Sequence, residues 1–290
     1  MQTLQNFEKI PSEELTAKFL EEAPQLEERD KARLQRRLFA DSLSGLWDEM
    51  SQGMSGFDGY KMLRLSLLFD PGDVLKDIQN AYKALMAFSA WQRVEDAITK
   101  ARRYLSGPFV IWSLMIADRT RPEVMEKFKG TVGFGSIPPY LLIGIWPSKY
   151  SLVHLSANAS REYHHVMRSS LFPINAIRYP LINSLVAEGL AENFVEELYG
   201  EEYVLNTAHS LDRKGVEKFW SKFSKSAKLN GVDQHKPFMY GGYRTGLPYG
   251  AGFAVGYHIV KSFRKNTGAK ARDIVTLPAR KILSQSDFDI

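Results

Sequence analysis

The stretch that decides how this chain is interpreted is ASREYHHVMR, residues 159–168. Residues four apart lie on one face of a helix, so positions 161 and 165 can converge on one ion while Glu162 stands beside them. This spacing is the geometry of the HExxH zinc motif, except that Arg161 stands where the motif has its first histidine.

A second stretch, VAEGLAE at residues 186–192, supplies an acidic residue in a suitable position. Glu188 follows His165 by 23 residues, which gives the His/His/Glu zinc set of gluzincin-type peptidases once the first histidine is restored. The 290-residue chain has no cysteine and six histidines, so a metal has to be held by histidine and carboxylate side chains. The same absence excludes a disulfide scaffold, an iron–sulfur protein and a cysteine nucleophile.

Composition and charge limit the classes of protein to which this chain can belong. With 44% apolar residues the chain can bury a real core, which excludes a disordered or fibrous protein. It shows neither a secretory signal nor an apolar run of membrane-spanning length, so we expect a soluble, cytoplasmic protein. Residues 1–105 carry 15 Lys and Arg against 17 Asp and Glu, whereas residues 106–290 carry 23 against 16. The basic half lacks a nucleic-acid-binding motif, so no nucleic-acid partner is expected.

GFGS at residues 133–136 lacks the Lys of a phosphate-binding loop and is interpreted as a turn.

The patterning predicts a predominantly helical α+β fold in two regions, a helical N-terminal region at 1–105 and a second region at 106–290. In the first, Ser12 is expected to cap a helix, and another helix is expected to start at Pro71 and continue towards Tyr104. In the second, strands are expected from Phe109 and over Pro139–Pro147, before helices at Ser156–Arg168, Leu181–Tyr199, Lys214–Lys228 and Gly252–Arg264.

From about residue 130 to 288 the chain resembles a family of predicted Zn-dependent proteases, domain of unknown function 2268. The similarity lies in several ordered segments: GFGSIPPYLLIGIWPSKY (133–150), REYHHVMR (161–168), AEGLAENFVEELYG (187–200), LPYGAGFAVGYHIVKSF (247–263) and LPARKIL (277–283). The resemblance implies a zincin-like domain over residues 106–290 that uses zinc and acts on a peptide or protein. It also implies that the strand at 139–146 is the sheet edge to which an extended peptide adds.

By the same resemblance, His165 and Glu188 match zinc ligands, and Glu162 matches the general base that deprotonates zinc-bound water. Tyr257 and His258, with Tyr249, are candidates for stabilising the developing oxyanion. His164 points about 100° away from His165 around the helix and is interpreted as a packing or supporting histidine.

Arg161 occupies the place of the first ligand, and a guanidinium has no lone pair to give to a metal. Four interpretations stay open. Arg161 is a surface residue of a helix in a shifted register, or it replaces the ion by pairing with Glu162 or Glu188, which is the interpretation we favour. Otherwise Glu162, His165 and Glu188 form a weakened metal site, or Arg161 is a lone substitution in an otherwise intact enzyme.

Further residues have both a structural and a functional interpretation. Glu192 is either a hydrogen-bond acceptor that orients His165 or part of a solvated face. Arg168 is a possible partner of a carboxylate such as that of Glu192. His154 is a remote candidate for a metal ligand. A Lys stripe from Lys214 to Lys225 makes a basic amphipathic helix, which is more often a solvated face than a membrane or nucleic-acid surface.

Two main functional hypotheses follow. The first is a zinc metallopeptidase relative, with activity in doubt because of Arg161. The second is a non-catalytic pseudopeptidase that keeps the cleft to bind a peptide or protein partner. The Lys-rich helix offers a third, weaker hypothesis of a binding module. The sequence does not determine the oligomeric state.

Overall fold

In a computed structural model, residues 7–51 and 56–288 are described, and they form two compact units. The first unit runs to Lys100 and resumes over Pro108–Glu162, and the second contains Ala101–Gly107 and the chain from Tyr163 onward. Helices α6 (Ala90–Tyr104) and α7 (Lys149–Leu171) each continue from one unit into the other. The predominantly helical α+β fold is confirmed, while the division of the chain at residue 105 stays a prediction.

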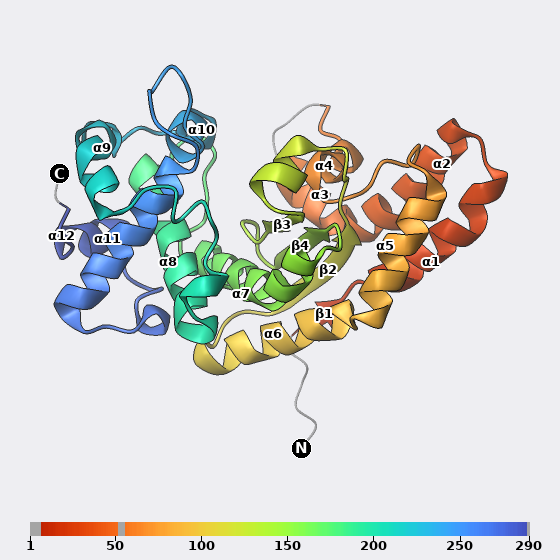
Figure 1. Ribbon diagram of the computed structural model, residues 1–290, viewed down its shortest axis with the longest axis horizontal. Coiled ribbons are helices and arrows are strands. Elements are labelled where there is room, and N and C mark those ends of the chain that lie inside the picture. Colours follow the sequence, from red (N-terminus) through yellow and green to blue (C-terminus); the bar gives the residue numbers. More distant parts are fainter. Residues whose placement is uncertain (1–6, 52–55, 289–290) are drawn as a thin grey trace. The chain divides into compact units, whose positions relative to one another are not determined.

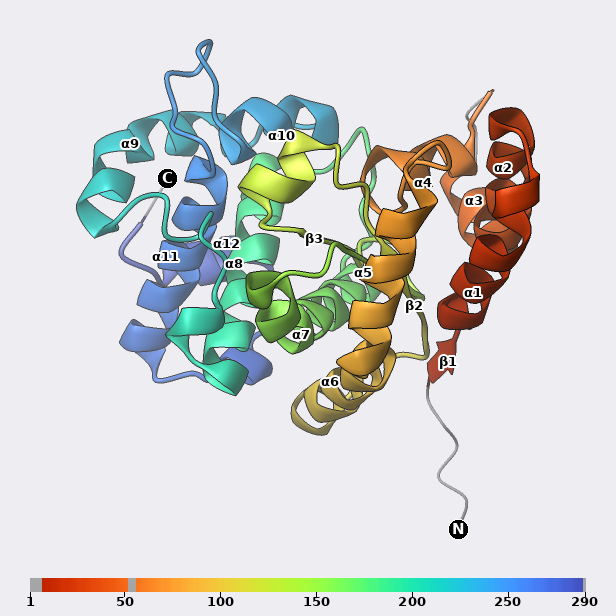
Figure 2. The same cartoon turned by 45° about the vertical axis from the view of Figure 1, so that its right-hand side comes forward.

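The first unit is built around a four-stranded sheet in the order β1-β2-β4-β3 (Figure 1). Strands β1 and β2 are parallel, as are β2 and β4, whereas β3 runs antiparallel to β4. Helices α1 and α5 pack against β2 (Figure 2). The bounds are β1 Phe7–Lys9, α1 Ser12–Glu22, α2 Glu28–Gln35, α3 Ser44–Ser51, α4 Gly59–Ser66, α5 Leu75–Ala87, β2 Val110–Ile116, β3 Thr131–Phe134 and β4 Tyr140–Ile145.

The second unit is helical in its described part. Its helices after α7 are α8 Leu181–Tyr199, α9 Arg213–Ser226, α10 Val232–Met239, α11 Ala251–Thr267 and α12 Ala279–Ser284. Helices α8 and α11 lie side by side (Figures 1 and 2) and meet at glycines, because the backbone of Gly256 occupies the space that a side chain at Gly189 would need. A buried apolar cluster that draws on all five helices surrounds this contact.

Local signals explain where the two central helices begin. The hydroxyl of Ser148 accepts a hydrogen bond from the backbone N–H of Ser151 (3.1 Å), and the hydroxyl of Ser151 accepts one from the N–H of Ser148 (2.8 Å). This reciprocal capping starts α7 seven residues before the predicted Ser156. Helix α8 has the predicted bounds, because Pro180 precedes it and Gly200, with a φ of 106°, ends it.

The structure corrects two helix predictions in the first unit. Ser12 is not the cap of α1 but its first helical residue, and its hydroxyl donates instead to the carbonyl of Leu114 (2.7 Å). The single helix predicted from Pro71 to Tyr104 is two, α5 and α6, because Ser89 adopts a left-handed conformation with a φ of 54°.

Two further corrections concern the sheet. The strand within 139–146, β4, is not an edge strand, because it lies between β2 and β3. The edge strand next to β4 is β3, a four-residue strand that takes in Gly133 and Phe134, so the first half of the GFGS segment is strand rather than turn. Among the described residues, no helix combines the length and apolar character that crossing a membrane requires.

Candidate functional site

Arg161 lies in the first unit, where it is held by a neighbour on α7 that is itself bonded to β3. Its side chain is buried, with 3% of the residue exposed, and it donates a hydrogen bond to the side-chain oxygen of Asn158. Asn158 in turn donates to the hydroxyl of Thr131 on β3. Burial contradicts the interpretation of Arg161 as a surface residue, because the guanidinium lies among polar groups inside this unit.

Glu162 lies beside Arg161 on α7 and faces the edge strand. It is 7% exposed, and its carboxylate fills the space that a Cβ would need at Gly133. Only glycine at position 133 therefore leaves this carboxylate in its present position next to β3. The link between the two residues cannot be predicted from the sequence, because their contact depends on the packing of α7 against the sheet.

His165 and Glu188 come together within the second unit. The Nε2 atom of His165 is 3.5 Å from Oε2 of Glu188, and the two side chains are 12% and 27% exposed. Two ligands of one tetrahedral zinc ion, each at about 2.0–2.1 Å from it, would lie roughly 3.3 Å apart. The spacing of this pair therefore suits two donors to a shared ion.

Among the described residues, no third protein donor joins this pair. In the part of the chain that the structure describes, no group of three or more His, Asp or Glu side chains is placed to hold a metal ion. Catalytic zinc sites take three protein ligands, and an arginine cannot serve as one. The residues present thus do not fit the zinc site of a peptidase as they stand.

Tyr257 and His258, the candidates for the oxyanion, belong to the contact between α11 and its neighbours. The Tyr257 hydroxyl donates to Oε2 of Glu196 (2.9 Å) and accepts from the Lys261 ammonium (2.8 Å), and burial raises the pKa of this tyrosine. His258 has Nε2 at 3.3 Å from the carbonyl of Leu211, and burial lowers its pKa. Both residues have structural partners, and their role in catalysis stays a prediction.

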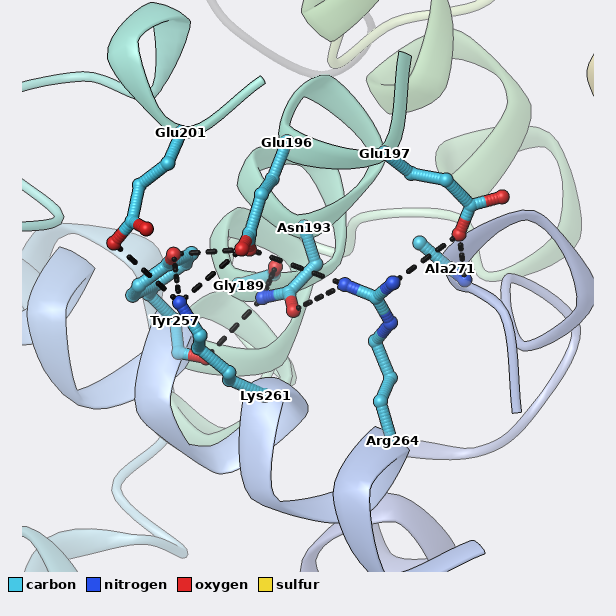
Figure 3. A network of polar contacts seen from close by, with 9 residues as sticks. All are labelled: Gly189, Asn193, Glu196, Glu197, Glu201, Tyr257, Lys261, Arg264 and Ala271. Carbon is cyan, nitrogen blue, oxygen red and sulfur yellow. Dashed lines mark hydrogen bonds and ion pairs between the residues drawn. The ribbon is translucent and has the colours of Figure 1, made fainter. Parts of the chain in front are cut away.

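Figure 3 shows the polar network between α8 and α11 to which Tyr257 belongs. Arg264 donates to Oδ1 of Asn193 (3.0 Å) and to Oε2 of Glu197 (3.3 Å), and Glu197 also accepts the backbone N–H of Ala271 (2.6 Å). Lys261 lies 3.2 Å from Oε1 of Glu196. These acidic residues follow Glu188 along α8, so the network fixes the helix that carries Glu188. This network cannot be predicted from the sequence, because no spacing within α8 indicates which cations α11 brings.

Two residues flanking the motif have structural partners. Glu192 is fully buried and accepts the backbone N–H of Leu205 (3.0 Å). Arg168 is also buried and donates to the carbonyls of Val275 and Leu277, and its pKa is lowered to about 10 by burial. These partners are backbone groups rather than the carboxylate expected for Arg168.

The remaining histidines of the motif region pack inside the protein or against aromatic neighbours. His164 is fully buried, neither ring nitrogen has a hydrogen-bond partner among the described residues, and burial lowers its pKa well below the usual value. His164 is therefore neutral, in agreement with a packing role. His154 stacks on Tyr150, with ring centroids 3.9 Å apart, and its Nδ1 lies 2.9 Å from the carbonyl of that residue.

The Lys-rich helix α9 turns its apolar side inward. Val216 and Phe223 are buried in the core of the second unit, with Phe219 and Trp220 packed against it. Lys222 donates to the carbonyl of Thr245 (2.6 Å). Because the apolar side of α9 is already covered by the core of the second unit, its basic side is interpreted as a solvated face.

Comparisons with known proteins place these residues in a family context. The family described as "Predicted Zn-dependent protease (DUF2268)" matches residues 90–284. The chain is similar to "Uncharacterized protein YjfC" of Bacillus subtilis (strain 168), with 27% identity over 79% of this chain and 81% of that protein. No solved structure matches the chain. All of the candidate site residues, from Arg161 to His258, fall inside the matched segment.

Proposed function

This chain belongs to the predicted Zn-dependent protease family, and we propose that it is a member whose metal site is degraded at Arg161. In this proposal the chain binds an extended peptide and hydrolyses it poorly or not at all. The family name indicates zinc dependence and a peptide substrate, and both are family properties rather than observations on this chain. The observation that carries the proposal is the buried guanidinium of Arg161, one helical turn before His165 on α7.

The chemistry of the donors supports this proposal. Arg161 carries a permanent positive charge and no lone pair, so it cannot bind zinc and would repel it. His165 and Glu188 keep a spacing that suits two ligands, but two donors leave a site incomplete. Because Arg161 is one helical turn before His165 on α7, a histidine there would add its nitrogen to the same side of the helix.

Electrostatics explain why an arginine can be tolerated at this position. Buried carboxylates around an empty metal site repel one another and lose hydration without compensation. A guanidinium supplies one positive charge and five N–H donors, so it can replace the charge of the missing ion. Glu162, 7% exposed and next to Arg161 in the chain, is a buried carboxylate close to such a charge.

The outer edge of β3 supports the peptide-binding half of the proposal. The backbone N–H of Trp146 donates to the carbonyl of Gly130, so in this antiparallel ladder Val132 and Phe134 are the next residues bonded to β4. Gly133 therefore directs its N–H and C=O away from β4, and it is exposed. An extended peptide can add to such an edge through main-chain hydrogen bonds, beside the Glu162 carboxylate.

The test of the degraded site compares the unmodified chain with Arg161→His and Arg161→Gln. Each protein is purified, its zinc content is measured after dialysis against zinc and then buffer, and hydrolysis of an unfolded protein such as reduced casein is followed. We expect near-stoichiometric zinc and hydrolysis for Arg161→His only. The Gln variant is the matched control, because it removes the guanidinium without adding a metal ligand.

Two results would contradict this half of the proposal. Stoichiometric zinc in the unmodified chain would favour a weakened but working site that includes Glu162. Failure of Arg161→His to gain zinc would mean that the loss extends beyond the first ligand. Adding Glu162→Gln to Arg161→His should retain zinc and abolish hydrolysis if Glu162 is the general base.

A further inference from the structure

A small apolar cavity lies beside the edge strand within the first unit. Its volume is about 90 Å³, and its wall includes Leu46 and Met50 of α3, Met62 and Leu67 near α4, Phe134 of β3 and Leu142 of β4. Every residue that lines this cavity is uncharged, and Gly133 is one of them. The same glycine thus belongs to the wall of the cavity and to the outer edge of β3.

The pleat of the sheet determines which side chains of an added strand would face this cavity. Thr131 and Gly133 lie on the side of β3 that faces α7, since Thr131 bonds Asn158 and Gly133 contacts Glu162. Alternate residues point to opposite faces, so Phe134 lies on the other side. Its cross-strand partner Leu142 shares that face and also lines the cavity.

Helix α4 covers this second face of the sheet. A side chain at Gly144, two residues after Leu142, would run into the backbone of Leu67. In a peptide paired with β3, every second side chain would point to the face of the sheet that α4 covers. These side chains would lie next to Phe134 and face α3 and α4. One of these side chains would therefore come to the cavity.

We propose that this cavity is the pocket for one aliphatic side chain, such as Leu, Ile, Val or Met, of a peptide bound along β3. This inference rests on the proposed peptide-binding function and adds to it the class of residue that the peptide must carry. An engineered cavity of about 150 Å³ takes up benzene, so a volume of about 90 Å³ suits an aliphatic side chain better than an aromatic one. Met50 and Met62 line the cavity with flexible thioether side chains that can adjust to its shape. A charged side chain would lose its hydration there without gaining a partner.

The inference assigns a role to helices outside the family match. Helices α3 and α4 end before residue 90, where the match begins, yet they supply much of the cavity wall. The N-terminal helices would thus select the peptide, while the matched segment contributes β3 and Glu162.

The test measures binding of fluorescein-labelled decapeptide pools by fluorescence anisotropy. Each pool has one central residue fixed as Leu, Met, Ser, Asp or Lys, and the other positions carry an equimolar mixture of Ala, Thr, Ser and Gln. Full burial of a leucine side chain gains enough free energy for a roughly tenfold or greater increase in affinity. We therefore expect the Leu and Met pools to bind at least about tenfold more tightly than the Asp pool.

A pair of variants tests whether the preference comes from this cavity. Met62 is 38% exposed at the rim, so Met62→Trp should fill the cavity and remove most of the preference for Leu while the protein stays folded. Met86→Trp on α5, at 47% exposure, makes the same substitution away from the cavity and should leave the preference unchanged. Circular dichroism and the melting temperature of both variants check that each is folded.

A third probe separates failure of this inference from failure of the proposed function. Two Leu pools are methylated at alternate backbone nitrogens, one at the odd and one at the even positions, so that each loses one hydrogen-bonding edge and at least one of them should lose binding. If all unmethylated pools bind equally and methylation abolishes binding, peptide pairing stands and the pocket is refuted. If no pool binds, or methylation has no effect, both the pairing and the pocket are refuted. Retention of the Leu preference in a folded Met62→Trp variant would also refute the pocket.

Discussion

The glycine contact between α8 and α11 allows a prediction whose size follows from the structure. A Cβ added at Gly189 would lie far inside 3.0 Å of the Gly256 carbonyl, so Gly189→Ala would require the two helices to separate by roughly 1 Å. The obstacle is a helix backbone, which cannot rotate away as a side chain can. Overpacking of this kind costs about 3 kcal/mol at the upper end of its usual range. The higher helix propensity of alanine returns about 1 kcal/mol.

The net loss is thus about 2 kcal/mol, or roughly 4–8 °C in melting temperature for a domain of this size. Scanning calorimetry is the suitable assay, because it can resolve separate transitions of the two units. Gly215→Ala in α9 is the matched control, since the nearest atom to its Cβ is the flexible tip of Leu211 at 3.0 Å. That control should melt near the unmodified protein or slightly above it. A Gly189→Ala protein that melts no lower than the Gly215→Ala protein would refute the argument.

Two further predictions concern His164 and Arg264. Burial keeps His164 neutral in the folded state, whereas in the unfolded chain it takes up a proton below its ordinary pKa near 6.5. Its contribution to stability is therefore complete above pH 6.5 and is lost as the pH falls below it, by up to about 1.4 kcal/mol per pH unit. His164→Leu should flatten this decline in urea unfolding measured from pH 7 to 5, and an unchanged slope would contradict the assignment. Arg264→Met removes the bonds to Asn193 and Glu197 and should lower the unfolding free energy by about 1–2 kcal/mol, with Arg264→Lys in between. Equal urea midpoints for Arg264→Met and the unmodified chain would show that the network contributes little.

The local parts of the fold could be predicted from the sequence. Helix α8 has the predicted bounds because Pro180 and Gly200 stop the helix at each end and apolar residues fill the turns between them. The placement of Arg161, Glu162 and His165 on one helix follows in the same way, since a helical spacing is a property of neighbouring residues. Glu188 was matched to this set by its spacing of 23 residues from His165 and by the family resemblance, and the structure brings its side chain to 3.5 Å from His165.

The edge of the sheet could not be predicted in this way. A single strand pattern cannot say which strands flank it, so β4 was predicted at the edge although β3 lies outside it. The four residues of β3 are too few to show a period, and two of them lie in a glycine-containing segment that is typical of a turn. The outward N–H and C=O of Gly133, on which peptide pairing depends, follow only from the register with β4.

The sequence by itself determined the helical class, the absence of cysteine ligands and the presence of an arginine four residues before His165. Only the tertiary structure decided which residues from other segments surround the residues of the candidate site and of the helix contact. Asn158 and Thr131 lie near Arg161, and Gly133 lies against Glu162. In the same way, Gly256 lies against Gly189. The physical reason is that periodicity and capping act between residues close together in the chain. Burial, close packing and a charge's surroundings depend on segments that only the folded chain brings together.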